Sequence, residues 1–223
     1  MKILNLYAGI GGNRKLWDKE HLGFDVDITA VELNPQIAKI YQDFFPQDKV
    51  IVADAHQYLL EHFKEYEFIW SSPPCPTHSR FNNISALRGG CKYPDMALYQ
   101  EIIYLKHWFK GKYCVENVIS YYEPLIKPYE LASHYFWANF HISARENITR
   151  NIRGEECHHR IKEFSEEYGM DLSKYTDVPD RRKIIKNCVE PETGLHILRE
   201  SIRNIHPELF EERGDFFPEP KRK

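Results

Sequence analysis

One cysteine in this sequence has the setting of a nucleophile. Cys75 lies in the stretch SSPPCPTHSR, residues 71–80, with prolines on both sides and an apolar run, EYEFIW, before it. An inert free cysteine usually behaves as a small buried hydrophobe and needs no stiffened backbone. A thiolate is a strong nucleophile once local dipoles or cations lower the thiol pKa from its usual value of about 8.5. The stretch therefore predicts covalent catalysis through Cys75, with an inert buried thiol as the alternative.

A second reactive group, Glu116, belongs to the stretch KYCVENV, residues 112–118. Burial raises the pKa of a carboxyl group, and a carboxyl group that keeps its proton can act as a general acid. The apolar runs around Cys75 and Glu116 are typical of neighbouring buried strands. We therefore expect a nucleophile and an acid at adjacent strand ends. The alternative for Glu116 is a structural acid.

A glycine turn and two acidic residues form a further candidate site. The turn GIGG, residues 9–12, follows an apolar run but lacks the GxGxxG spacing of dinucleotide sites, so it could also be only a tight turn. Glu32 could accept hydrogen bonds from ribose hydroxyls, and Asp54 from the amino group of adenine. Each acid alone could be a helix N-cap or a loop residue. Together with the glycines they predict an adenosine site, and the absence of a Walker loop excludes ATP.

The elements that must position these groups alternate along the chain. The pattern predicts strands at 2–6, 26–32, 49–54, 65–72 and 112–118, and helices at 13–22, 35–45 and 96–109. Such alternation is typical of an α/β fold with a doubly wound, Rossmann-like parallel sheet, whose ligands bind beyond the carboxyl ends of the strands. The candidate residues all fall at successive strand ends: Gly9, Glu32, Asp54, Cys75 and Glu116. We expect one site along one edge of the sheet.

Composition excludes several classes of protein. The chain has 223 residues, 42% hydrophobic and 28% charged, with a formal net charge of −3. This predicts one compact main domain, in which any binding of nucleic acid requires a local basic face. The apolar part of the N-terminal stretch is too short for a signal peptide, and no later run reaches membrane-spanning length. We expect a cytoplasmic protein without membrane association.

The five cysteines indicate neither a disulfide framework nor a metal centre. They form no CxxC pair and leave one over if paired. The run Cys157, His158 and His159 is spaced poorly for a single ion. We expect no bound metal.

The motifs together resemble those of the DNA cytosine-5 methyltransferases. LYAGIGG is similar to the cofactor loop of that family, PPC with Ser79 to its nucleophile loop, and ENV to its catalytic glutamate signature. KNCVEPETG, residues 186–194, is similar to a C-terminal segment that returns to the cofactor pocket. The resemblance implies S-adenosylmethionine as cofactor, with these residues in contact: Tyr7, Ala8, Gly9, Gly11, Gly12, Glu32, Leu33, Asp54, Ala55, Pro73 and Asn187.

The resemblance also implies a mechanism and a division of the chain. Cys75 would add to carbon 6 of a flipped-out cytosine while Glu116 protonates nitrogen 3, so that carbon 5 accepts the methyl group. It implies a catalytic and cofactor-binding domain at 1–140, a small target-recognition lobe at 141–180 and a returning C-terminal segment at 181–223. DNA is the expected substrate. RNA is an alternative, since some family members methylate tRNA.

Two other classes stay open on the sequence alone. The first is a cofactor-binding partner of a larger methyltransferase, against which the presence of both Cys75 and Glu116 argues. The second is an amino-group methyltransferase, against which the missing aromatic residue after SSPP argues.

The sequence departs from the family pattern in its arginines. The family carries Gln-x-Arg-x-Arg before its sixth strand, and its arginines help to orient the base and its phosphate; the matching positions hold Glu130, Ala132 and His134. Pro76 replaces a glutamine after the nucleophile. The recognition lobe is small, so specificity could come from a protein partner. The candidates for the missing arginine function are Arg80, Arg145, Arg150 and Arg153.

Overall fold

The protein is an α/β structure built on one sheet. The computed structural model describes residues 1–80, 82, 92–144, 157–178 and 181–203. The strands are β1 (Lys2–Leu6), β2 (Asp27–Glu32), β3 (Lys49–Val52), β4 (Phe68–Ser71), β5 (Lys112–Val118), β6 (Tyr129–Leu131) and β7 (His134–Ala138). Their order in the sheet is β3-β2-β1-β4-β5-β7-β6.

The strand order confirms the doubly wound fold. The first five strands are parallel, whereas β7 runs antiparallel to β5 and β6 antiparallel to β7. The chain proceeds outward from β1 to β3 and then returns to place β4 on the other side of β1. This reversal creates a switch point at the carboxyl ends of β1 and β4, where ligands bind in such sheets. Leu6 is in register with both Val31 and Ser71, so these strand ends are level.

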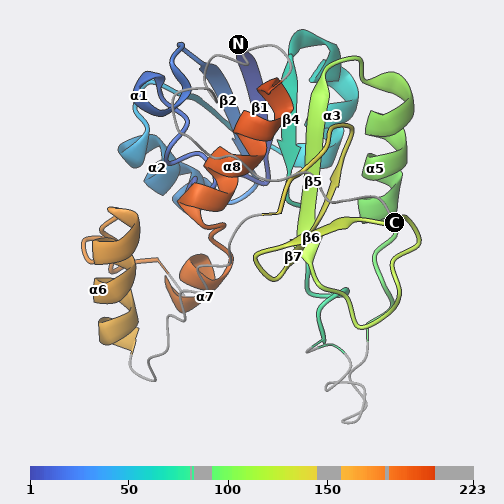
Figure 1. The fold of residues 1–223 in the computed structure, drawn as a ribbon. Coiled ribbons are helices and arrows are strands. Elements are labelled where there is room, and N and C mark those ends of the chain that lie inside the picture. The colour runs from blue at the N-terminus through green and yellow to red at the C-terminus, as the bar shows by residue number, and fades with distance from the viewer. Residues whose placement is uncertain (81, 83–91, 145–156, 179–180, 204–223) are drawn as a thin grey trace.

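Helices cover both faces of the sheet (Figure 1). They are α1 (Lys19–Leu22), α2 (Pro35–Phe44), α3 (Ala55–His62), α5 (Ala97–Trp108), α6 (Cys157–Tyr168), α7 (Arg181–Lys186) and α8 (Pro191–Ile202), with a 3-10 turn η1 (Phe63–Glu65). One face packs against α3 and α5 through Leu59, Leu98 and Ile102. The other packs against α8, which buries Leu195 and Leu198 beside the sheet.

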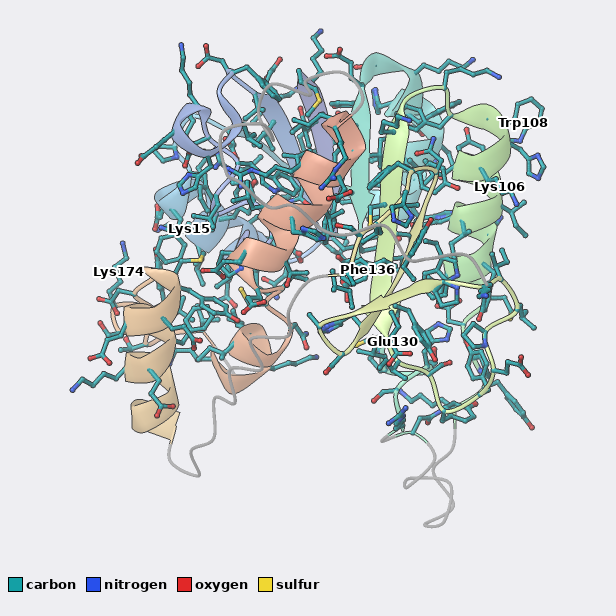
Figure 2. The ribbon with its side chains drawn as sticks, in the orientation of Figure 1. Lys15, Lys106, Trp108, Glu130, Phe136 and Lys174 are labelled. Carbon is teal, nitrogen blue, oxygen red and sulfur yellow. The ribbon has the colours of Figure 1, made fainter. Side chains whose placement is uncertain are left out.

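The C-terminal part of the chain packs against the N-terminal part. Phe164 and Ile184 share a buried cluster with Ile40 and Tyr41 of α2. Figure 2 shows Lys15 on the same side of the molecule as α6, and its Nζ donates to the carbonyl of Gly169 at 3.2 Å. The predicted boundaries at 140 and 180 stay predictions. Within the described ranges, no helix is both long and apolar enough to cross a membrane.

Three local predictions differ from the structure. The helix predicted at 13–22 forms only over Lys19–Leu22, because turns bonded between residues three apart occupy the preceding stretch, including Arg14 N–H to the carbonyl of Gly11 at 3.1 Å. Arg14 is buried there in a bidentate pair with Asp48. The helix α3 was not anticipated. The stretch NCVEPETG, residues 187–194, predicts a turn before a helix at 195–202, but α8 begins within it at Pro191, a favourable first helical residue.

Candidate active site

The turn after β1 is closed by Glu32. The backbone N–H of Gly9 donates to Oε2 of Glu32 at 3.0 Å, and that of Asn34 donates to Oε1 at 2.9 Å. Gly9 and Gly11 have φ values of 54° and 84°, which favour glycine. The tight turn is therefore real. Each carboxylate oxygen still has a lone pair that could accept a ribose hydroxyl.

The returning C-terminal segment lies directly on this turn. A Cβ added at Gly12 would collide with Sγ of Cys188 and the carbonyl of Val189. Asn187 directly follows α7, its N–H donating to the carbonyl of Lys183 at 3.0 Å, and it is exposed. The segment that the resemblance placed beside the cofactor loop is thus in contact with it, which is why position 12 requires glycine.

The remaining predicted cofactor residues surround the same edge. Ala8 is buried and its N–H donates to the carbonyl of Val31 at 3.0 Å. Asp54 is exposed and caps α3, accepting from the N–H of Gln57 at 2.8 Å, while Ala55 is buried behind it. Asp54 is therefore an N-cap, as one interpretation held, with acceptor capacity left over.

These residues fit an adenosine-bearing cofactor. A Cβ added at Gly9 would meet open space, which leaves room for a ligand beside the backbone. Leu33 is 66% exposed next to the Glu32 carboxylate and offers an apolar surface. An apolar surface flanked by carboxylate acceptors suits a nucleoside.

A buried acid behind this edge was missed by the sequence analysis. Glu101 of α5 is fully buried and accepts hydrogen bonds from the Tyr7 hydroxyl at 2.6 Å, His56 Nδ1 at 2.9 Å and the Ser71 hydroxyl at 2.7 Å. The hydrogen bond to Glu101 raises the pKa of His56. Burial, followed by the charge of Glu101, raises the pKa of Tyr7. The network ties the cofactor turn to β4, which leads into the nucleophile loop.

The sequence contained a signal for Glu101. Leu98, Ile102 and Leu105 mark the buried face of α5, and Glu101 falls on that face at helical spacing. A carboxylate among such positions indicates buried hydrogen-bond donors.

The nucleophile loop is held from two sides. Pro73 is buried, and its carbonyl accepts from Nδ2 of Asn117 at 2.9 Å. The carbonyl of Cys75 accepts from the N–H groups of His78 at 3.0 Å and Ser79 at 3.1 Å. His78 Nδ1 lies 2.6 Å from the hydroxyl of Tyr122. Asn117, the middle residue of ENV, therefore positions the loop, a role that the motif alone did not reveal.

A lowered pKa, the condition under which Cys75 would be a standing thiolate, is not met in the protein alone. Burial, and then the negative charge of Glu116, raise the pKa of this thiol. A backbone hydrogen bond and the charge of Lys183 act in the opposite direction without outweighing them. Cys75 is half-buried, and the protein alone holds it as a thiol at neutral pH. Cys75 follows β4 and Glu116 belongs to β5, which pairs with β4, so the two groups come from neighbouring strands.

Glu116 is buried near the carboxyl end of β5. His134, at the last arginine position of the Gln-x-Arg-x-Arg pattern, lies beside it. Oε1 of Glu116 is 3.7 Å from Nε2 of His134, which belongs to β7. Among the other candidates for the missing arginines, Arg80 is exposed. Arg145, Arg150 and Arg153 lie outside the described residues, as does Cys91. Within the part of the chain that is described, no three potential metal ligands cluster, and the side chains of 157–159 fall outside it.

The fold and the site define a Rossmann-like methyltransferase. The sequence model of the C-5 cytosine-specific DNA methylase family matches residues 1–118, more than half of the chain, and the protein belongs to that family. Members of the family take the methyl group from S-adenosylmethionine, so the cofactor prediction is confirmed.

Individual relatives match shorter stretches. The chain is 31% identical over 81 residues to a tRNA (cytosine(38)-C(5))-methyltransferase of Spodoptera frugiperda, a match that covers 35% of this chain and 24% of the relative. Among solved structures it is similar to a Spodoptera frugiperda DNMT2 mutant, with 28% identity, a TM-score of 0.37 and coverage of 52% of this chain and 35% of that one. The S. pombe Dnmt2 methyltransferase is 22% identical, with a TM-score of 0.36 and coverage of 53% of this chain and 34% of that one. The chain thus spans about a quarter of the curated relative's length.

Proposed function

We propose that the protein transfers a methyl group from S-adenosylmethionine to carbon 5 of cytosine in DNA, through a covalent adduct with Cys75. The observation that carries the proposal is the junction of two strand ends. Asn117 Nδ2 holds the Pro73 carbonyl at 2.9 Å, and the charge of Glu116 acts on the Cys75 thiol. The junction joins a nucleophile and an acid beside a nucleoside-binding edge.

In this mechanism Cys75 and Glu116 have complementary tasks. Cys75 gives its proton to solvent, and its thiolate attacks carbon 6 while Glu116 donates a proton to nitrogen 3, which makes carbon 5 nucleophilic. S-adenosylmethionine supplies an electrophilic methyl group. Loss of the carbon 5 proton to solvent and of the Cys75 thiolate then releases the methylated base, and Glu116 takes back the proton of nitrogen 3.

The raised pKa of Cys75 links the two tasks. Because the negative charge of Glu116 disfavours the thiolate, a proton on Glu116 removes that opposition. When Glu116 carries a proton, the Cys75 thiolate therefore has no neighbouring anion, and this is the pairing that the reaction needs.

RNA is the second candidate substrate, favoured by one observation. The curated relative at 31% identity acts on tRNA according to its name, whereas the family description names DNA. Both substrates present the same cytosine ring, so the chemistry of Cys75 and Glu116 is common to them. A protein partner that supplies target specificity is compatible with either.

The test is methyl transfer from labelled S-adenosylmethionine to DNA and to tRNA in parallel, followed by nucleoside analysis. The proposal predicts 5-methylcytosine from DNA. Label in tRNA alone would favour the second candidate. Label in N4-methylcytosine or N6-methyladenine, or in neither nucleic acid, would contradict the proposed function.

A further inference from the structure

The ring of His134 lies between two hydrogen-bond acceptors. Nδ1 is 2.9 Å from the carbonyl oxygen of Ala132, and Nε2 is 3.7 Å from Oε1 of Glu116. A neutral imidazole has one N–H and can donate to only one of these oxygens, whereas an imidazolium has two. An imidazolium could therefore present an N–H to each oxygen, with the Glu116 contact at ion-pair distance.

The β6–β7 hairpin fixes this position. Its two turn residues, Ala132 and Ser133, have φ values of 48° and 64°. Non-glycine residues adopt this left-handed region rarely, and they keep it only where other contacts hold them. The bond from His134 Nδ1 to the Ala132 carbonyl spans this turn. The ring is thus anchored by its own hairpin.

The register of the strands places His134 and Glu116 on one face. Val118 pairs with His134 and Glu116 pairs with Phe136, so Glu116 and His134 are diagonal neighbours. Figure 2 shows Glu130 and Phe136 on the same hairpin. Glu130 pairs with Tyr135, and its side chain therefore lies on the face opposite to His134.

We propose that His134 is a positioning residue whose imidazolium stabilises the carboxylate that Glu116 becomes when it gives its proton to cytosine. The inference rests on the proposed function. The O–H bond of Glu116 breaks as the N–H bond at nitrogen 3 forms and the Cys75 sulfur joins carbon 6. His134 keeps both of its protons throughout, and the proton returns to Glu116 when the thiol leaves.

The stabilisation is selective for the reacting state. Before proton transfer, His134 faces a neutral acid; afterwards it faces a full negative charge in a site where Glu116 is only 7% exposed. A charge-assisted hydrogen bond strengthens as that charge develops. Only an interaction that is stronger in the transition state than in the ground state accelerates the chemical step. The distance of 3.7 Å leaves room for shortening in the complex.

Other titratable groups also face Glu116. The pKa values of Cys75 and Cys114 are raised by burial and, after that, by the charge of Glu116. Lys183 of α7 acts on Cys75. Since His134 occupies the last arginine position of the family pattern, this chain has a pH-dependent charge there.

The test compares single-turnover methyl transfer by the wild type, His134→Gln and His134→Arg between about pH 5.5 and 8.5, on whichever nucleic acid the wild type methylates. His134→Gln removes the charge, and His134→Arg makes it permanent. We expect the rate of His134→Gln to be about tenfold or more below wild type at low pH. The rate of His134→Gln should approach that of the wild type as pH rises and the wild-type imidazole loses its charge, and His134→Arg should exceed the wild type there.

Each result decides a different point. A His134→Gln to wild-type ratio that is constant over pH would overturn the role of His134 and leave the proposed function intact. A wild type that methylates neither nucleic acid overturns the proposed function itself. Imidazole ¹⁵N spectra of the free protein provide a measurement without catalysis. Glu116→Gln should change the Nε2 signal of His134 and leave Nδ1 nearly unchanged, and equal or absent changes would overturn the pairing.

Discussion

The two carboxylates at the edge of the sheet, Glu32 and Glu116, are held in opposite ways. Each oxygen of Glu32 accepts a backbone N–H, at 2.9 and 3.0 Å. Glu116 is buried, and its ion-pair partner His134 is at 3.7 Å. The cofactor half of the site is thus bonded into shape by its own backbone. The catalytic half holds a buried carboxyl group whose contacts become complete only with a base in place.

This difference separates the expected effects of substitution. Changes in the catalytic half should reduce turnover and leave cofactor binding intact, because its groups act on the reacting base. Changes in the cofactor half should weaken binding of S-adenosylmethionine. A substitution that affects both equally would break the comparison.

The largest effect is expected for Cys75→Ser. Serine is a far weaker nucleophile than a thiolate at neutral pH, so methyl transfer should disappear while affinity for S-adenosylmethionine stays nearly unchanged. Turnover assays and calorimetry measure the two quantities. Cys91, beside Gly89 and Gly90 in the sequence, is the main rival for the nucleophile role; Cys91→Ser is therefore the matched control and should keep full activity. The opposite behaviour of the two variants would make the nucleophile assignment wrong.

Glu116→Gln should come next, with turnover reduced by about 10²–10⁴-fold, the range typical of general acid catalysis. Its affinity for the free cofactor should equal that of the wild type. Glu130→Gln, on the other face of the β6–β7 hairpin, is the matched control and should be active. A normal rate for Glu116→Gln would show that the residue is only structural.

Glu32→Ala and Asp54→Ala should each weaken cofactor binding by about 1–3 kcal/mol, because a donor group of the ligand loses its acceptor in the complex. Glu32→Ala also leaves the backbone N–H groups of Gly9 and Asn34 without this acceptor, so its effect should be the larger. Calorimetry with free S-adenosylmethionine provides the values, with the exposed Glu61→Ala as control. Unchanged affinity in both variants would remove the adenosine site.

The smallest effect concerns His56 and the stability of the network behind the cofactor turn. Its hydrogen bond to Glu101 raises the pKa of His56. The stabilisation of the fold by the protonated ring is therefore complete below the pKa of about 6.5 that the imidazole has in the unfolded chain. It is lost as pH rises through the higher pKa of the folded protein. In urea denaturation, the free energy of unfolding of the wild type should fall relative to that of His56→Gln as pH rises through this range. The exposed His107→Gln should show no such trend, and parallel curves for His56→Gln would contradict the assignment.

The sequence revealed the cofactor half more completely than the catalytic half. Turn glycines and strand-end acids act locally, so motif and periodicity were enough to place Gly9 and Glu32 at one edge. Where prediction failed locally, a buried partner decided the outcome. Arg14 lies in a stretch with helical spacing. It is buried in a bidentate pair with Asp48, and the chain around it forms turns instead of a helix.

The catalytic half depends on contacts between distant segments. The position of His134 follows from a hairpin whose left-handed residues are Ala132 and Ser133, and neither residue type indicates that conformation. The raised pKa of Cys75 follows from burial and from Glu116, which is remote in sequence. Residue types identified the reacting groups, while their charges depend on packing that no local pattern encodes.

The central claim is a covalent bond between Cys75 and cytosine, and a trapping experiment tests it most directly. The protein is incubated with S-adenosylmethionine and DNA that contains 5-fluorocytosine, whose fluorine prevents the elimination that frees the thiol. Mass spectrometry of the digested product should find the methylated base attached to Cys75, and no adduct should form with Cys75→Ser. An adduct at another residue, or methyl transfer without any trapped adduct, would contradict the account.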